Sequence, residues 1–412
     1  MAKVSTVTKT SHYGNYPTGT YPILLAYGFR PFFLLLPLYL ILSIVLWGLL
    51  WGGVLPLQLT QNPMDWHQYE MLFGLAGAGI AGFLLTAIPE FFEQHAPLVG
   101  KPLLALVLLW LGGRISFWLI DFTGIYLTAL LNVGFYVVMI ALVAKPILTD
   151  PLRRQWGLLV ALSLLVGLQV WFFAARLGWL ETATLSILQF SIHAFMILVL
   201  LVLRRVGTAA LSEQLEHKGI DAVFLARPPR YNFAIFIIAL YGVVEYITPQ
   251  HPSLAWLALA AAAAVLNLLN DYFEKEVPVL CLYPAWLLWL TIILMALGYG
   301  LLGIDHLNKD GYALNHFRHV LTSGALGLAY LAIMSIVAVV HTGRDLQPNY
   351  GVLLAAILLI TATALRSFIP FYPTWIQAAY LGSALLWASA FAIYLWQFAA
   401  FLWHRRVDGL PG

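Results

Sequence analysis

Charged residues are scarce in this chain. Only 9% of its 412 residues are Asp, Glu, Lys or Arg, whereas 62% are hydrophobic, and an average globular domain has about 25% charged residues. No soluble core needs this much apolar surface, so the composition predicts a protein that crosses the lipid bilayer many times. The net charge of +3 indicates basic loops on one membrane face rather than a nucleic-acid partner.

Cysteine is almost absent as well. The one cysteine, Cys281, lies in an apolar run, which excludes an internal disulfide, a cysteine-ligated iron–sulfur cluster and a thiolate zinc site. The first 22 residues are polar and contain no short apolar core followed by small residues, so we expect no signal peptide. The sequence also has no P-loop, dinucleotide-binding fingerprint or zinc-protease motif.

Long apolar runs dominate what is present. A helix needs about 20 apolar residues to span a bilayer, and the sequence has twelve such runs, separated by turn sequences such as TQNP and TDPLRR. The predicted fold is therefore all-α, with a single polytopic membrane domain over residues 1–412. We expect this domain to consist of two six-helix halves, at about 1–205 and 230–412, which a cytoplasmic loop at 206–229 connects. The expected spans are Phe32–Val54, His67–Ile88, Pro102–Ile120, Gly124–Ala144, Trp156–Ala175, Ala183–Leu203, Asn232–Ile247, Leu254–Leu269, Val279–Leu302, Leu314–Val340, Val352–Phe368 and Trp375–Trp403.

The stretch DWHQYEMLFG begins the second span with ionisable groups. His67, Glu70 and Met71 are at positions i, i+3 and i+4, so a helix places them on one face. An imidazole, a carboxylate and a thioether can bind a transition metal, and the soft sulfur suits Cu(I). Glu70 could instead pair with an outer-leaflet cation such as Arg114, and the small residues that continue this face could simply pack against another helix.

Two further spans carry histidines. His316 and His319 share a face at the outer end of the tenth span, and His193 lies near the middle of the sixth, where the cost of burial favours a functional role. A neutral imidazole can ligate haem iron, although a lone buried histidine is more often a hydrogen-bonded core residue. His341 lies roughly 33 Å beyond His319 along a helix, so it belongs to a separate inner metal site or only satisfies a carbonyl group.

Several longer motifs occur along both halves of the chain. They are AYGFRPFFLL before the first span, WHQYEMLFG and IAGFLLTAIP in the second, LWLGGR in the third, and HVLTSGALGLAYL with HTGR in the tenth. In this order they resemble the motifs of the NnrS family. The family consists of twelve-span bacterial inner-membrane proteins that contain haem and copper and are linked to nitric oxide metabolism and nitrosative-stress tolerance. The resemblance therefore implies an inner-membrane, multi-pass protein with a b-type haem, copper and nitric oxide as its ligand. The family usually has a second histidine where this chain has Tyr69.

We expect the implied site toward the outer leaflet, on spans two, six and ten. The expected haem-binding residues are His193, His319 and, for the propionates, Arg114. The expected copper ligands are His67 and His316, with Glu70 or Met71 nearby. The candidate catalytic residues are Glu70, as an acceptor that orients His67 or as a proton donor to a bound ligand, and Tyr69, as a weak ligand or proton donor.

Three functions fit these expectations. The first is a haem protein, with or without copper, that binds nitric oxide or reduces it with electrons from an unidentified donor. The second is a transporter of a metal, haem or a metal–nitrosyl species, for which twelve spans are a common layout. The third is a non-catalytic haem or metal protein that protects metal centres. Haem absorbance at a stoichiometric level would argue against simple transport, and nitric oxide consumption would separate catalysis from binding.

The basic residues generate a prediction about topology. With the N-terminus inside, 16 of the basic residues fall on the inner side of the twelve spans, 4 fall on the outer side, and Arg114 lies within a span. Because positively charged loops stay in the cytoplasm, we expect both termini to be cytoplasmic. Reporter fusions to each terminus check this orientation, and a periplasmic C-terminus would contradict it.

Overall fold

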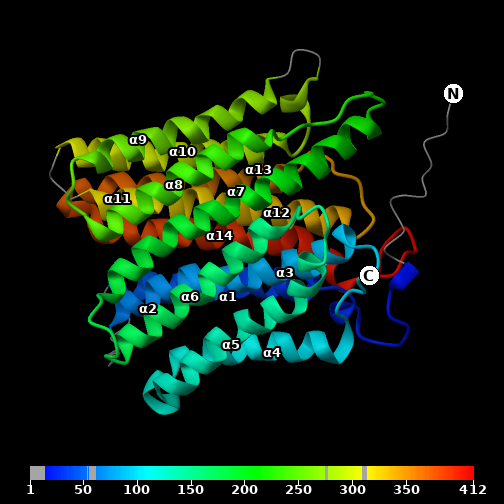
Figure 1. The fold of residues 1–412 in the computed structure, drawn as a ribbon, viewed down its shortest axis with the longest axis horizontal. Helices are drawn as coiled ribbons and strands as arrows, with labels where there is room; N and C mark the ends of the chain where they lie inside the picture. The colour runs from blue at the N-terminus through cyan, green and yellow to red at the C-terminus, as the bar shows by residue number, and fades with distance from the viewer. Residues whose placement is uncertain (1–13, 53, 55–61, 274–276, 309–312) are drawn as a thin grey trace.

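The computed structural model describes residues 14–52, 54, 62–273, 277–308 and 313–412. In this part of the chain every regular element is helical, and twelve helices are long and apolar enough to cross a membrane. The all-α, twelve-span prediction is therefore confirmed. Figure 1 shows the helices running roughly side by side along the long axis of one bundle. The orientation of this bundle in a bilayer stays a prediction.

The elements are close to the expected spans. The helices of the first six spans are α1 (Phe29–Trp51), α2 (Pro63–Tyr69) with α3 (Leu75–Phe91), α4 (Gly100–Trp118), α5 (Ile120–Leu148), α6 (Trp156–Arg176) and α7 (Thr184–His217). The helices of the last six are α8 (Pro228–Ile247), α9 (Ser253–Leu266), α10 (Ala285–Asn308), α11 (Leu314–His319) with α12 (Gly327–Val340), α13 (Tyr350–Phe368) and α14 (Ile376–Trp403).

Two boundaries differ from the sequence-based expectation for identifiable reasons. The second span begins at Pro63 rather than His67, because the Asn62 side chain accepts a hydrogen bond from the backbone N–H of Met64 and Pro63 occupies the first turn, a favourable helix start. α7 continues to His217, so the first half of the expected loop 206–229 is helical. The extension buries an apolar face that includes Leu211 and Leu215, which stabilises it beyond the apolar run.

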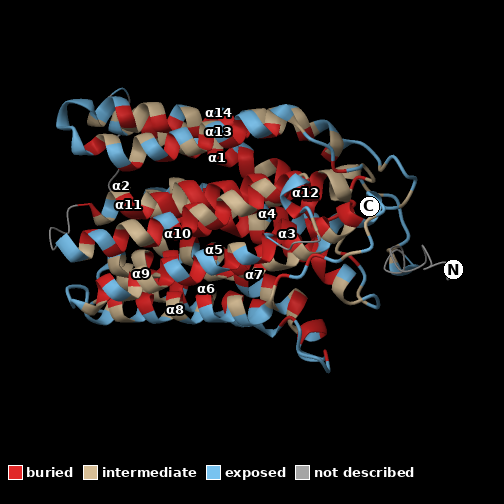
Figure 2. Ribbon diagram, turned by 90° about the horizontal axis from the view of Figure 1, so that it is seen from above, coloured by how far each residue is buried: buried red, intermediate tan, exposed pale blue. Residues whose placement is uncertain are grey.

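The second and tenth spans form the centre of the bundle. In their most apolar stretches 89% and 83% of the residues are buried, compared with 67% in the sixth span and less elsewhere among the described helices. Figure 2 shows buried residues along α3 and α12 and exposed residues on the outer faces of the peripheral helices. Helix α1 packs against both α14 and α12. The two sets of six helices therefore share one core.

Both central spans are interrupted by a π-helical segment. These segments are η3 (Glu70–Gly74), between α2 and α3, and η6 (Val320–Leu326), between α11 and α12. A π turn inserts a residue and changes the direction of the side chains that follow, and such segments occur often at functional sites. In both views α2 and α11 lie at the same end of the bundle, opposite the C-terminus (Figures 1 and 2).

Arg30 holds the last helix at the other end of the bundle. Its side chain is 0% exposed, and it donates hydrogen bonds to the carbonyl oxygens of Leu402 (2.8 Å), His404 (2.8 Å) and Gly412 (2.6 Å). The last carbonyl groups of a helix have no partners within the helix and carry partial negative charge. The Arg30 guanidinium satisfies such groups at the end of α14 and ties this helix to α1.

We expect Arg30→Gln to destabilise the protein, because the carbonyl groups at the end of α14 would lose a charged donor in a buried place. The free energy of unfolding should fall by about 3 kcal/mol. Thermal melting of the purified protein in one detergent measures this. Arg405→Gln is the matched control, since Arg405 is exposed in the same segment. Equal melting temperatures for the two variants would contradict the role given to Arg30.

Candidate functional site

A buried ion pair lies at the first π-helical segment. Arg114 of α4 donates to Glu70 Oε2 at 2.7 Å, and the Tyr39 hydroxyl of α1 donates to the same oxygen at 2.6 Å. Arg114 also donates to the side chain of Asn132, and Trp118 donates to the Tyr39 oxygen at 3.0 Å. Glu70 is 0% exposed, yet its Oε1 has no hydrogen-bond partner. One carboxylate oxygen is thus fixed, and the other is free to accept a proton or a hydrogen bond.

Gly74 makes room for this pair. A methyl group at Gly74 would clash with the Arg114 guanidinium and with Glu70 Oε2. Its carbonyl oxygen accepts a hydrogen bond of 2.9 Å from the Trp110 indole of α4. A glycine at the end of the π segment therefore lets α4 approach closely enough to deliver Arg114.

His67 precedes the ion pair by one turn and contacts the same helix, α1. Its ring stacks on Trp47 with centroids 4.0 Å apart and an interplanar angle of 2°. Nδ1 of His67 is buried and has no hydrogen-bond partner. Stacking on Trp47 therefore holds the ring in place, while Nδ1 has no partner. Because an unpartnered buried nitrogen costs free energy, this nitrogen would gain from binding a ligand or a metal.

His319 lies at the end of α11, where the second π segment begins. The side chain is half-buried, and Nδ1 is 2.8 Å from the carbonyl oxygen of Asn315. A proton on Nδ1 would be donated to this carbonyl, which leaves Nε2 as the nitrogen with a free lone pair, an arrangement typical of metal-binding histidines. Helices α2 and α11, which carry His67 and His319, lie at the same end of the bundle (Figures 1 and 2), and the two side chains are within range of a weak electrostatic interaction. The structure therefore places two of the histidines that the sequence singled out in one region, one from each central span.

A cation lies beside these histidines. Arg366 of α13 interacts electrostatically with both His67 and His319, and its guanidinium is 3.1 Å from Nδ1 of His316. It also lies over the Tyr380 ring at 4.3 Å. Among the described residues no carboxylate forms a salt bridge with Arg366. The sequence did not single out this residue, because its position near the histidines depends on the packing of α13 against α11.

His193 is held in a different network. Its Nδ1 is 3.0 Å from the hydroxyl of Tyr299, and its Nε2 is 2.9 Å from Glu245 Oε2. Gly242 allows the approach, since a methyl group there would lie 2.9 Å from the imidazole Cδ2. Both ring nitrogens are engaged, so neither is free for iron in this arrangement. The expected haem pair of His193 with His319 has no support in this geometry.

The network around His193 continues toward the end of α10. Glu245 Oε1 accepts hydrogen bonds from Tyr241 at 2.7 Å and from Arg318 at 3.0 Å, and the Tyr241 oxygen is 3.1 Å from Nε2 of His306. Arg318 is the neighbour of His319 in α11. This second buried carboxylate–arginine pair therefore supports the candidate site from the side of the tenth span. The tyrosines of this network could not be told from ordinary apolar filling in the sequence.

The remaining predicted residues lie elsewhere. Tyr69 points toward α6, where its hydroxyl donates to Gln169 at 2.7 Å and its ring packs against Phe172 and Phe173. Met71 is half-buried against the core. His341 is near the other end of the bundle, with Nδ1 3.1 Å from a Glu90 carboxylate oxygen.

Arg114 and the expected copper ligands also have other partners. Arg114 pairs with Glu70, which is the alternative left open by the sequence, and His316 contacts Arg366. Across the described ranges no three His, Cys, Asp or Glu side chains are grouped in a way that could hold a metal ion. The copper ligand set of His67 and His316, with Glu70 or Met71 nearby, therefore stays a prediction.

Comparison with protein families gives a match to the family described as NnrS protein, and the match covers residues 23–406. This match spans the second and tenth spans and every residue of the two buried networks. Comparisons with curated proteins and with solved structures give no match.

The buried pair generates a prediction about stability. Glu70→Gln should leave Arg114 charged and uncompensated, and breaking a buried pair in this way costs about 3–5 kcal/mol. The double variant Glu70→Gln with Arg114→Met should recover most of the loss, because no unpaired charge remains. Melting temperatures of both variants test this, with Glu93→Gln as an exposed control. A double variant less stable than Glu70→Gln would contradict the account.

Proposed function

We propose, from the premise that the chain belongs to the NnrS family, that it is a haem-binding membrane protein of the bacterial inner membrane that binds or reduces nitric oxide. The family and the multi-pass helical fold are established. Haem, nitric oxide and the inner membrane are our proposal. The observation that carries the proposal is that His67 and His319, from the two central, π-interrupted spans, lie at the same end of the bundle within range of an electrostatic interaction.

The residues at this convergence fit a haem. His67 has a buried nitrogen with no partner, and His319 has one nitrogen committed to Asn315 and the other free. An imidazole with an available nitrogen would suit haem iron as a ligand. Arg366 is a cation without a carboxylate partner among the described residues, and arginine recognises carboxylates well, so it suits a propionate group. His67 and His319 would thus hold the iron, and Arg366 the edge of the macrocycle.

A bound haem would supply an iron centre that binds nitric oxide and accepts single electrons. The chain supplies a proton-binding group nearby. Glu70 lies one turn from His67, and its Oε1 has no partner whereas its Oε2 is fixed by Arg114 and Tyr39. This carboxylate is therefore placed to hold a proton at Oε1 for a ligand, which is a common use of a positioned carboxyl group. Reduction would require electrons from a donor such as a partner protein or quinol.

The proposal does not include copper. Of the expected ligands, Glu70 is occupied by Arg114 and Tyr39, and His316 by Arg366. Tyr69, which stands where the family usually has a histidine, is turned toward α6. A copper site built on these residues would require the ion pair at Glu70 to open.

Replacing the proposed ligands should remove haem. We expect His67→Ala and His319→Ala each to lower the haem absorbance per protein to about a tenth or less of wild type, since a residue proposed to hold the iron is lost. His193→Ala should keep the haem, because both its nitrogens bind protein groups. Absorption spectra of the purified variants, oxidised, reduced and with nitric oxide, measure this. Loss of haem only in His193→Ala would contradict our assignment and restore the ligand expected from the sequence.

Replacing the carboxyl group should affect turnover more than haem content. We expect Glu70→Gln to retain most of the haem and to lower nitric oxide consumption, or protection against nitric oxide, by roughly 100-fold, which is the usual scale for losing a proton donor. Activity is to be divided by haem content, so that a loss of folded protein caused by the lower stability of this variant does not affect the comparison with wild type. Normal activity per haem in a less stable protein would leave Glu70 a purely structural residue.

A further inference from the structure

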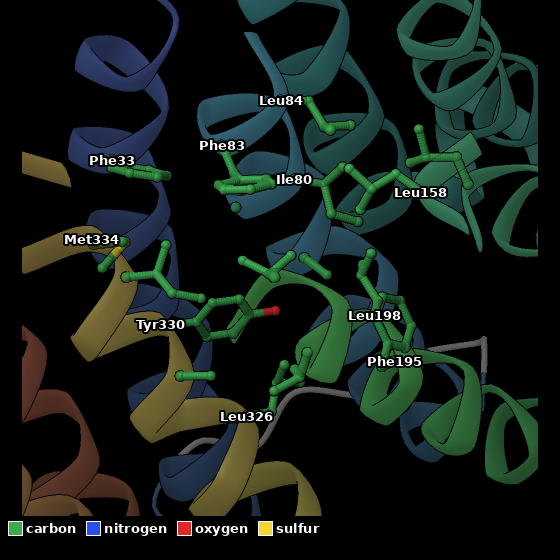
Figure 3. A pocket seen from close by; sticks show the side chains of 17 residues that line it. Phe33, Ile80, Phe83, Leu84, Leu158, Phe195, Leu198, Leu326, Tyr330 and Met334 are labelled. Atoms are coloured by element: carbon green, nitrogen blue, oxygen red, sulfur yellow. The ribbon is translucent and has the colours of Figure 1, made fainter. Parts of the chain in front are cut away.

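An apolar cavity lies in the middle of the bundle, further along the same two central spans. It is walled by side chains of α1, α3, α6, α7, the end of η6 and α12, and Figure 3 shows Phe33, Phe83, Leu158, Phe195 and Met334 around it. Its volume is about 60 Å³, counted as the space open to the centre of a water-sized sphere. A single water needs about 10–15 Å³ by the same measure. The cavity is thus larger than one water molecule and far smaller than a haem.

One polar group points into this space. Tyr330 of α12 is 8% exposed, and its hydroxyl oxygen is buried without a hydrogen-bond partner. Figure 3 shows this oxygen directed into the cavity and away from the helix that carries it. A buried hydroxyl without a partner costs free energy. The hydroxyl can therefore stabilise any occupant that accepts a hydrogen bond.

The chemistry of the walls selects the occupant. An ion would lose its hydration with no counter-charge, at a high cost. Water needs two to four polar partners, and among the lining residues only Tyr330 offers one. A small uncharged molecule of low polarity meets neither obstacle, since apolar cavities of this kind bind atoms such as xenon. A weak acceptor atom on that molecule would satisfy the tyrosine hydroxyl.

We propose that this cavity is a binding site for a small, uncharged, weakly polar molecule of the size of a diatomic gas, with Tyr330 as its hydrogen-bond donor. Such molecules dissolve in the hydrocarbon of the bilayer, and the cavity is lined by helices that are long and apolar enough to cross it. Resting on the proposed function, the occupant is nitric oxide. α3 and α12, which line the cavity, continue through η3 and η6 to His67 and His319, so the cavity would store the ligand between membrane and site.

Xenon tests the cavity without reference to haem. Crystals of the protein under xenon pressure should show an anomalous peak beside Tyr330. Ala329→Leu, which adds three carbon atoms at a lining position, should abolish the peak with little change in melting temperature. Ala338→Leu is the matched control on α12, buried but outside the cavity. It should lower the melting temperature, because no space is available there, and keep the xenon peak. A lipid acyl chain in the cavity, or no xenon, would overturn the proposal.

Nitric oxide tests the hydrogen bond. In lipid nanodiscs, nitric oxide added without oxygen should displace xenon, as followed by xenon NMR. Tyr330→Phe keeps the walls and removes the donor, so xenon affinity should stay unchanged while the concentration of nitric oxide that displaces half of the xenon rises roughly threefold, as expected for one weak hydrogen bond. An equal concentration in wild type and Tyr330→Phe would overturn the role of the hydroxyl. The haem content of His67→Ala, by contrast, tests only the proposed function. A failure of the cavity proposal and a failure of the proposed function can therefore be told apart.

Discussion

The pairing of Glu70 with Arg114 inside an apolar bundle is the constraint on which the rest of the site depends. Removing two charges from water costs several kcal/mol for each, and the cost is offset only when geometry and additional hydrogen bonds are good. Tyr39 and Asn132 supply those bonds from α1 and α5. Gly74 allows the close approach of α4, and the π turn at Glu70–Gly74 lies at the same place. The helices around this pair therefore cannot shift independently.

The second buried carboxylate–arginine pair, Glu245 with Arg318, resembles the pair of Glu70 with Arg114 and lies on the side of the site formed by the tenth span. Glu245 binds Arg318 and a tyrosine, Tyr241, as Glu70 binds Arg114 and Tyr39. His67 lies one turn before Glu70, and His319 follows Arg318 directly. Each proposed haem ligand is thus attached to a helix segment that a buried ion pair holds in position. Fixed ligands are what a metal centre requires, because a loosely held imidazole lowers affinity.

The two ends of the central spans differ in chemistry. Near α2 and α11 they carry histidines, carboxylates and arginines, whereas further along α3 and α12 the lining is apolar except for Tyr330. This separation follows from the bilayer as solvent, since ionisable groups within a membrane are tolerated only where they are paired or functional. It places proton-binding groups beside the proposed iron site and leaves an apolar space where an uncharged ligand can accumulate.

The sequence by itself determined the number of spans, because the length and hydropathy of a membrane helix are local properties. It also singled out His67, Glu70 and His319, since so few ionisable residues occur in these runs. Only the tertiary structure decided which of them meet. Depth along each helix can be counted from the sequence, but the rotation of one helix against another cannot. Because of that rotation, His193 contacts Glu245 and Tyr299, Tyr69 is directed toward α6, and Arg366 lies beside the histidines. Two π turns change the direction of the side chains further, and the hydrophobic periodicity of the sequence does not predict them.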